Sequence, residues 1–407
     1  MALLEGIHIR NYRALHDVSL GKLPDQRKAE KLPKLIAVIG PNGSGKSSIM
    51  DAMGFIGDCL QLGVEEACDR PHRGGFERLR TRGCHAPIGF ELYYRESPKG
   101  RPISYTLEID CNEAGRPHVV FEQLRQARSG KVHGRLFPFV ELRNGAGYAW
   151  AGEATETGEG ERREEVRLTD SQQLGITVLG QIAEHPRITA FRDFLRGWYL
   201  SYFVPELARG LPTAGAHKHL NRTGENLANY VQFLERNHPD RFGEVLKRIE
   251  RKIPGIRNIR HERQKDGRLL LQFNERGYED PFYAADMSDG TLKMFAYLLL
   301  MEDPEPAPLV GIEEPENGLH HQLLETLASE LRRYARRETG PQVFVTTHAP
   351  YFVDALKPEE VWVVTKGNDG FSTVARAADL PGVREMHAEG LPLGSLWYSN
   401  HFGRGNP

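Results

Sequence analysis

The chain has 407 residues, of which 39% are hydrophobic and 27% are charged. This composition is that of an ordinary folded protein, and it excludes wholesale disorder, a fibrous repeat and a small disulfide-stapled scaffold. The length suits two or three domains. The formal net charge of -2 excludes a strong overall attraction to nucleic acid or to acidic membranes, so any such contact must be local.

The cysteines and the N-terminus bear on the compartment. Four cysteines at wide spacing form neither a CxxC pair nor a dense disulfide framework, which favours a reducing environment. The first residues lack the pattern of a signal peptide, and the longest apolar stretch, Met294 to Met301, is far shorter than the ~20 residues that span a bilayer. We therefore expect a soluble, cytoplasmic protein without a membrane segment.

The N-terminal part of the chain alternates short β-like runs with turns, at 3–10, 35–39, 88–95 and 103–109. A helix that starts near Gly45 interrupts this pattern. The glycine-rich, polar stretch from 129 to 167 predicts a hairpin or a mobile surface excursion and not a buried element.

Helical periodicity begins near residue 170 and predicts helices at 224–236 and 239–252, followed by strands at 256–263 and 268–273. The last third alternates helix (290–301), strand (309–313), helix (319–336) and strand (343–346), with further strands at 361–365 and 371–375. Such alternation predicts an α/β fold with a mostly parallel sheet flanked by helices. No internal repeat and no sustained heptad pattern is present, so we expect no long coiled-coil arm.

A phosphate-binding motif follows the apolar strand KLIAVI. The segment GPNGSGKSS matches G-x-x-x-x-G-K-[ST], in which glycines let backbone N–H groups turn toward a phosphate at the start of a helix. The residues predicted to surround the nucleotide phosphates are Gly40, Pro41, Asn42, Gly43, Ser44, Gly45, Lys46, Ser47 and Ser48. Lys46 would reach the β- and γ-phosphates and Ser47 would bind Mg²⁺. The alternative is a glycine-rich turn with a solvated lysine.

Two carboxylates end a later apolar strand, PLVGIEEPENGL. Adjacent side chains at a strand tip point to opposite sides, so one carboxylate can face Mg²⁺ while the other faces the attacking water. We assign Glu313 to the metal and Glu314 to the water. The alternative is an acidic pair that only stabilises a helix N-terminus.

Two further segments fit the same chemistry. In MSDGTLKMF, Ser288 has the character of an N-cap and Gly290 opens an apolar helix, which together make an anion site. In VFVTTHAP, a strand ends next to His348, which places an imidazole at the edge of the same sheet. A plain helix cap and an ordinary loop histidine are the alternatives.

In order and spacing, GPNGSGKS, SDGT, the carboxylate-tipped strand with ENGLH, and TTH resemble the Walker A, signature, Walker B, D-loop and switch-histidine motifs of ABC-type ATPases. The opening IHIRNYRAL and the run IEEPENGLHH resemble the RecF, SMC-like and OLD-type branch. The resemblance implies that Arg13 approaches the phosphates and that Ser288 and Gly290 meet the γ-phosphate bound by an opposite subunit. It also implies that residues 317–320 line the dimer seam. His320 and His321 could be taken for metal ligands, but because no third ligand is nearby in the sequence we interpret them as polar seam residues.

The chain departs from the ABC pattern at three points. SDGT replaces the LSGGQ signature of transporters, Glu313 stands where most relatives have Asp, and Gln123 is only a weak candidate for the Q-loop glutamine. The expected parts are residues 1–128 (N-terminal head with Walker A and a β lobe), 129–167 (excursion), 168–287 (helical lobe) and 288–407 (C-terminal head).

We therefore expect an ATPase with ATP and Mg²⁺ as cofactors, closing as a homodimer around two ATP molecules. The resemblance implies a switch in DNA repair or in defence against foreign DNA, with DNA or a separate nuclease or effector protein as partner. Basic stretches at 70–82 and 257–268 could contact nucleic-acid phosphates, although solvated charge is the alternative. The energy subunit of a membrane transporter and a slow-turnover ATP-sensing scaffold are the competing functions.

Overall fold

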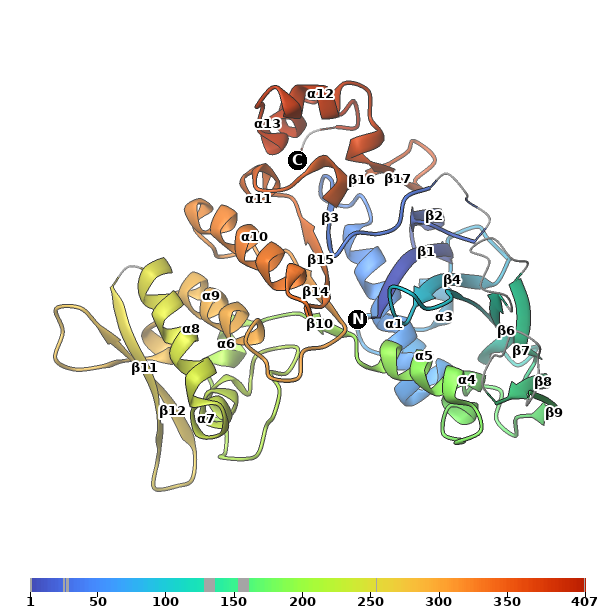
Figure 1. The fold of residues 1–407 in the computed structure, drawn as a ribbon, viewed down its shortest axis with the longest axis horizontal. Coiled ribbons are helices and arrows are strands. Elements are labelled where there is room, and N and C mark those ends of the chain that lie inside the picture. Colours follow the sequence, from blue (N-terminus) through green and yellow to red (C-terminus); the bar gives the residue numbers. More distant parts are fainter. Residues whose placement is uncertain are drawn as a thin grey trace.

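The computed structural model describes residues 2–24, 26, 29–127, 136–152, 161–253, 255–405 and 407. A six-stranded sheet lies at the centre of the fold (Figure 1). Its strands, in spatial order, are β10 (Tyr199–Ser201), β14 (Leu309–Glu313), β15 (Gln342–Thr347), β3 (Leu35–Ile39), β16 (Val361–Lys366) and β17 (Ser372–Arg376). The first five are parallel and β17 is antiparallel. The two ends of the chain thus build one sheet, which confirms the predicted α/β head.

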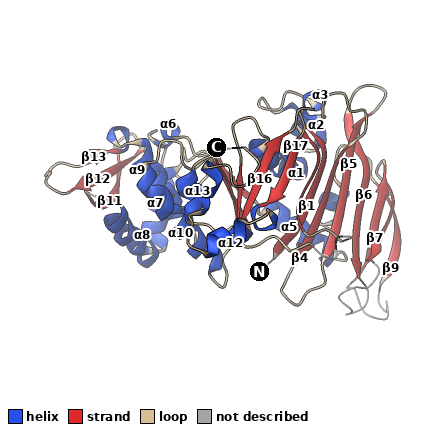
Figure 2. Cartoon of the chain, turned by 90° about the horizontal axis from the view of Figure 1, so that it is seen from above, coloured by secondary structure: helices blue, strands red, loops and turns tan. Residues whose placement is uncertain are grey.

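An eight-stranded antiparallel sheet forms one end of the molecule (Figure 2). In spatial order it contains β2 (Leu15–Gly21), β1 (Leu3–Tyr12), β4 (Ile88–Arg95), β5 (Ile103–Cys111), β6 (Pro117–Ala127), β7 (Leu136–Arg143), β8 (Ala146–Ala151) and β9 (Arg162–Arg167). β7 to β9 come from the stretch predicted to be an unburied excursion. The predicted hairpin is present as the antiparallel pair β7 and β8, but the expectation of an unburied element was wrong for β7, because Phe139, Val140 and Leu142 are buried in the sheet; residues 129–135 and 153–160 lie outside the described residues.

A small three-stranded sheet lies at the opposite end, with β11 (Ile256–Arg263), β12 (Leu269–Glu275) and β13 (Phe282–Tyr283). The helices are α1 (Lys46–Leu62), α2 (Val64–Asp69), α3 (Phe76–Leu79), α4 (Gly175–Leu179), α5 (Pro186–Arg196), α6 (Pro205–Ala208), α7 (Leu227–Asn237), α8 (Pro239–Lys252), α9 (Asp289–Leu300), α10 (His321–Arg336), α11 (Pro350–Asp354), α12 (Val383–Ala388) and α13 (Leu393–Tyr398). Short 3₁₀ turns are η1 (Ala284–Asp286), η2 (Pro358–Glu360) and η3 (Ala377–Asp379).

The central sheet separates two apolar cores. Successive side chains of a strand point to opposite faces, so Ile36 and Val38 of β3 join the core shared with α1 and the antiparallel sheet. Ala37 and Ile39 join the core on the other face, which includes α9 and α10. This two-sided burial explains the continuous apolar run of β3, as is usual for parallel strands.

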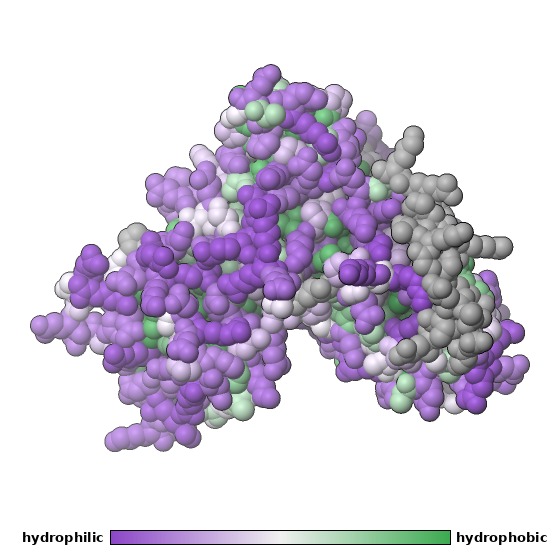
Figure 3. All heavy atoms as spheres, in the orientation of Figure 1, coloured by the Kyte–Doolittle hydropathy of each residue, from purple (hydrophilic) through white to green (hydrophobic). Residues whose placement is uncertain are grey.

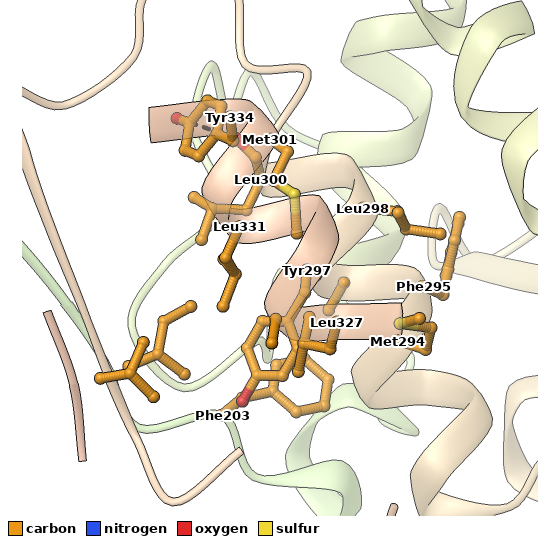
Figure 4. Close-up of a cluster of buried hydrophobic side chains, with 14 of the residues drawn as sticks. Phe203, Met294, Phe295, Tyr297, Leu298, Leu300, Met301, Leu327, Leu331 and Tyr334 are labelled. Atoms are coloured by element: carbon orange, nitrogen blue, oxygen red, sulfur yellow. Dashed lines mark hydrogen bonds between the residues drawn. The ribbon is translucent and has the colours of Figure 1, made fainter. Parts of the chain in front are cut away.

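Helix α9 is apolar on nearly all sides and is accordingly buried (Figure 4). Phe295 packs edge-on against Phe273 of β12, with ring centroids 5.7 Å apart. Residues Leu327 and Leu331 of α10 lie in the same cluster. The helix that carries the SDGT segment is therefore held rigidly in the core.

The side chain of Gln342 ties the first strand to the central sheet. Its Oε1 accepts a hydrogen bond from the Leu4 amide at 3.0 Å, and its Nε2 donates to the Leu4 carbonyl at 2.9 Å.

Hydrophilic side chains dominate the face of the molecule that Figure 3 shows. Among helices in the described ranges, none combines the length and apolar character that a membrane crossing needs.

Candidate functional site

The phosphate loop connects β3 to α1 through residues 40–45, and its backbone requires glycine at two crowded positions. Gly40 and Gly45 have φ of 154° and 111°. A Cβ at Gly40 would lie 2.2 Å from the Val364 carbonyl oxygen, and one at Gly45 would lie 2.4 Å from Ser372 Oγ. The loop therefore folds tightly against β16 and β17.

Ser372, which the sequence did not single out, supports this loop. Its buried hydroxyl donates to the Ser44 carbonyl at 2.6 Å, and its amide donates to the Ala14 carbonyl at 2.8 Å. A surface cavity of about 420 Å³ borders the other side of the loop at Asn42 and Gly43, where Lys366 and Arg404 add positive charge. The surroundings suit an anion.

Lys46 is the first residue of α1 and is buried. Its ammonium donates to the carbonyls of Gly40 at 2.9 Å and Pro41 at 3.1 Å. Burial lowers its pKa, while the charges of Glu314, Glu316 and Glu313 act to raise it. Lys46 thus lies close to the whole acidic segment that follows β14.

Glu313 ends β14 and is hydrogen-bonded by the hydroxyl of Ser47. Burial raises the pKa of its carboxyl; the Ser47 hydroxyl and Lys46 lower it, and Glu314 and Asp51 raise it. Since only the ionised carboxylate binds a cation, protons and Mg²⁺ would compete for it.

These residues fit the chemistry of Mg²⁺, which is commonly held by one or two carboxylates together with substrate phosphates and water. One carboxylate and one hydroxyl converge here, beside the phosphate loop. Within the described part of the chain, no group of three or more His, Cys, Asp or Glu side chains could hold a metal alone. A cation at this place would therefore depend on a bound nucleotide.

Glu314 adopts a left-handed backbone conformation with φ of 42°, which is unusual for a residue other than glycine. Its amide donates to the Thr346 carbonyl at 2.9 Å, and Oε2 accepts from Asn317 Nδ2 at 3.0 Å. Oε1 lies 3.7 Å from His348 Nδ1. Such strained positions cluster at functional sites, where the surrounding structure enforces them.

Glu316 is a site residue that the sequence analysis missed. Oε1 of this buried carboxylate accepts from the Thr347 hydroxyl at 2.8 Å and from the His348 amide at 2.6 Å, and it lies 3.1 Å from His348 Nδ1. In the sequence, Glu316 is the third acidic residue of the run EEPE. The interpretation of Glu313 as a metal ligand and Glu314 as the residue that positions water gave this third residue no role.

The switch-histidine candidate His348 follows β15, whose neighbours in the sheet are β14 and β3. These three strands are parallel, so the phosphate loop, Glu313–Glu314 and His348 all leave the same carboxyl edge. Ligands in open parallel sheets bind at that edge. The structure thus brings Lys46, Ser47, Glu313, Glu314 and His348 together.

Ser288 caps α9, accepting from the Thr291 amide at 3.2 Å, and it is exposed. A Cβ at Gly290 would lie 2.7 Å from the Gly318 carbonyl oxygen, so the SDGT turn packs directly on the ENGLH turn. Within the described residues, the hydrogen bonds of the Ser288 side chain go to Thr291. The SDGT turn is thus built against the D-loop candidate, with Ser288 open to solvent.

Two further candidates from the sequence are Arg13, which contacts α1, and Gln123, which lies on β6. The Arg13 guanidinium lies 2.9 Å from Asp51 of α1, and its residue has φ of 52°. Asp51 is close enough to Glu313 to raise the pKa of that carboxyl. Gln123 lies on β6 of the eight-stranded sheet and donates to Glu141 at 2.8 Å, so its side chain is engaged within that sheet.

Tyr202 was also missed and follows β10, the neighbour of β14. Burial raises the pKa of its phenol, and the charges of Glu313 and Asp51 raise it further. Tyr202 therefore lies within range of the charge of Glu313. Its sequence context, YLSYFVP, carries no motif that would have identified it.

In the basic stretch at 70–82, two arginines are paired within the protein. Arg73 is buried between Asp51 at 3.0 Å and Asp58 at 2.7 Å, and Arg80 pairs with Glu77 and Asp110. The prediction that these two arginines could contact nucleic acid was therefore wrong, because their charges are already neutralised.

The fold resembles solved SMC heads. One, described as the SmcHead bound to the C-winged helix domain of ScpA, is 14% identical with a TM-score of 0.51, over 91% of this chain and 97% of that chain. The SMC head domain of Thermotoga maritima is 14% identical (TM-score 0.44, 92% and 98% covered). The Smc head domain with an extended coiled coil bound to the C-terminal domain of ScpA, from Pyrococcus furiosus, is also 14% identical (TM-score 0.48, 92% and 96% covered).

No curated protein matches the chain. A family model described as "AAA domain, putative AbiEii toxin, Type IV TA system" matches residues 35–354, from β3 through α11. The first SMC head confirms the expected ABC-type head fold, and the family match identifies an AAA domain. The chain belongs to the family of AAA domains described as putative AbiEii toxin, Type IV TA system.

Proposed function

We propose that the protein hydrolyses ATP with Mg²⁺ and that two copies close head to tail around two nucleotides. The observation that carries the proposal is the meeting of Lys46, Ser47, Glu313 and Glu314 at the carboxyl edge of adjacent parallel strands. A lysine, a hydroxyl and two carboxylates around a phosphate loop are the parts that phosphoryl transfer to water requires.

The roles follow from the geometry. Backbone amides of the phosphate loop and Lys46 would hold the β- and γ-phosphates, and Ser47 and Glu313 would hold Mg²⁺, which neutralises developing charge on the phosphate oxygens. Glu314 would orient the attacking water and take its proton, because it stands at the strand tip beside Glu313 without sharing the Ser47 contact. His348, 3.7 Å from Glu314, would hydrogen-bond the γ-phosphate.

Closure by a second copy is supported by the position of Ser288. The N-terminus of the 12-residue helix α9 and the Ser288 hydroxyl form an anion site that is open to solvent. One γ-phosphate has little need of two such sites from a single subunit. We therefore place Ser288 and Gly290 against the nucleotide of the opposite copy, with residues 317–320 at the seam.

Lys46→Ala tests the nucleotide site. We expect the affinity for ATP to fall by about 30-fold, since a charged hydrogen bond to phosphate is lost, and Mg²⁺-dependent hydrolysis to become undetectable. Isothermal titration calorimetry and phosphate release measure the two effects. Lys247→Ala, on the exposed surface of α8, is the control and should behave as wild type. Full hydrolysis in the Lys46 variant would refute the proposed site.

A role on nucleic acid is proposed as the use of this ATPase, in repair or in defence against foreign DNA. The second basic stretch supports it, because Arg257, Arg260 and Arg263 of β11 have exposed side chains without an ion pair to any other described residue. They lie on the three-stranded sheet, at the opposite end of the molecule from the eight-stranded sheet (Figure 2). A separate nuclease or effector protein would then respond to closure.

Replacing these three arginines with alanine should weaken duplex DNA binding and reduce the slope of log affinity against log salt by about 3. Fluorescence anisotropy over a salt series, with and without MgATP, measures the slope. The control changes Arg162 and Arg163 of β9 and should retain the wild-type slope. A slope unchanged by the triple substitution removes this surface from the proposal.

Two other uses of the same ATPase remain distinguishable by experiment. Co-purification with an integral membrane protein would favour the energy subunit of a transporter. Tight ATP binding with turnover near zero, also in the presence of DNA, would favour an ATP-sensing scaffold.

A further inference from the structure

Glu316 joins three separate segments of the chain. One of its oxygens accepts from the Thr347 hydroxyl and the His348 amide, at 2.8 and 2.6 Å, so it fixes the backbone at the end of β15. The same oxygen lies 3.1 Å from the His348 ring nitrogen Nδ1. A buried carboxylate thus determines where the His348 ring lies relative to Glu314.

Lys293 approaches Glu316 from the SDGT helix. Its buried ammonium donates to the Asn317 carbonyl at 2.5 Å. Burial lowers the pKa of Lys293, and Glu316 is the carboxylate that opposes this most strongly, ahead of Asp289, Glu206 and Glu314. Lys293 thus contacts the backbone of the residue next to Glu316 and lies within range of the charge of Glu316, which acts more strongly in a buried environment than at the surface.

The hydrogen bonding of this cluster is incomplete. Glu316 Oε2 is a buried atom without a hydrogen-bond partner among the described residues, and the 3.1 Å contact between Glu316 Oε1 and His348 Nδ1 lacks the geometry of a hydrogen bond. A buried polar atom without a partner costs about 1–3 kcal/mol. His348, whose ring contacts Glu316, lies 3.7 Å from Glu314 Oε1, so the position of Glu316 bears on the group beside Glu314.

We propose that Glu316 is a positioning residue for His348 and Glu314, and that Lys293 transmits its position to the SDGT turn. The inference rests on the proposed function. When a second copy places a phosphate against Ser288, that contact would hold α9 and its Lys293 in place, and Glu316 would pass the constraint to His348. Hydrolysis would thereby be coupled to closure inside each subunit.

The test uses Glu316→Gln, Lys293→Met and the double variant in the full chain. For Glu316→Gln we expect kcat to fall by about 100-fold and for Lys293→Met by about 10-fold, with KM for ATP changed by less than about 3-fold. The double variant should be no slower than Glu316→Gln, because residues that act as one unit have non-additive effects. The control is Glu122→Gln, a buried carboxylate in the antiparallel sheet that accepts from the Ile176 amide at 3.1 Å.

A second readout does not depend on hydrolysis. In protein with ¹³C-labelled histidine, the His348 ring signal, assigned with His348→Gln, should shift in Glu316→Gln and in Lys293→Met but not in Glu122→Gln. Wild-type kcat in Glu316→Gln, multiplicative losses in the double variant, or an unshifted His348 signal would each overturn the inference. A wild-type protein that does not hydrolyse ATP while the His348 signal shifts as expected would instead refute the proposed function alone.

Discussion

Glu314→Gln is expected to lower the steady-state rate of ATP hydrolysis by about 10³-fold while ATP stays bound. The amide keeps the size of the side chain and its contact with Asn317, which is 3.0 Å away. It cannot take a proton from water, whereas Lys46, Ser47 and Glu313 remain in place to hold the nucleotide. The variant should therefore separate binding from chemistry.

The measurement combines single-turnover phosphate release with equilibrium binding of ATP. The control is Glu325→Gln, on the exposed face of α10, which should hydrolyse ATP at the wild-type rate. A hydrolysis rate in Glu314→Gln within a few-fold of wild type would remove Glu314 from the mechanism, even with the rest of the site intact.

Ser288→Arg should abolish cooperative hydrolysis and leave the ATP affinity of the monomer within about 2-fold of wild type. The arginine would obstruct the solvent-facing N-terminus of α9 that we place against the second copy, and the helix would also lose its cap, at a cost of about 1 kcal/mol. The phosphate loop of the same chain does not involve this residue, so binding by a monomer should persist.

Hydrolysis measured over a range of protein concentrations reports the cooperativity, and calorimetry at low concentration reports the monomer affinity. Ser329→Arg, at an exposed position of α10, is the matched control for the added bulk and charge. Loss of affinity in the Ser288 monomer would mean that the SDGT turn binds the nucleotide of its own chain, contrary to the proposed head-to-tail arrangement.

The phosphate loop and the strand tip could be predicted because their chemistry is local. Residues 40–48 form a contiguous motif, and Glu313 and Glu314 follow an apolar run that predicts its own strand. Both segments must bind the same nucleotide, so the sequence also predicted that they meet at one sheet. The structure brings them together because β3 pairs in parallel with β15, and β15 with β14.

The remaining features depend on contacts between distant segments. Glu316 is held in position by a hydrogen bond from the hydroxyl of Thr347, which lies 31 residues later in the chain. No local sequence pattern indicates that contact. Arg73 is neutralised by Asp51 and Asp58, which share one face of α1 but stand far from it in sequence. The burial of β7 and β8 could not be predicted from the sequence, because their short apolar runs lie between glycine-rich, polar segments.

Light scattering of Glu314→Gln after size-exclusion chromatography tests the central claim most directly. Without nucleotide the expected mass is that of one chain, and with MgATP it should double, because two trapped nucleotides hold the copies together. Adding Lys46→Ala to the same variant should keep the mass at one chain, and the experiment can be repeated with duplex and single-stranded DNA. A mass that stays at one chain while ATP is demonstrably bound would contradict the ATP-closed dimer.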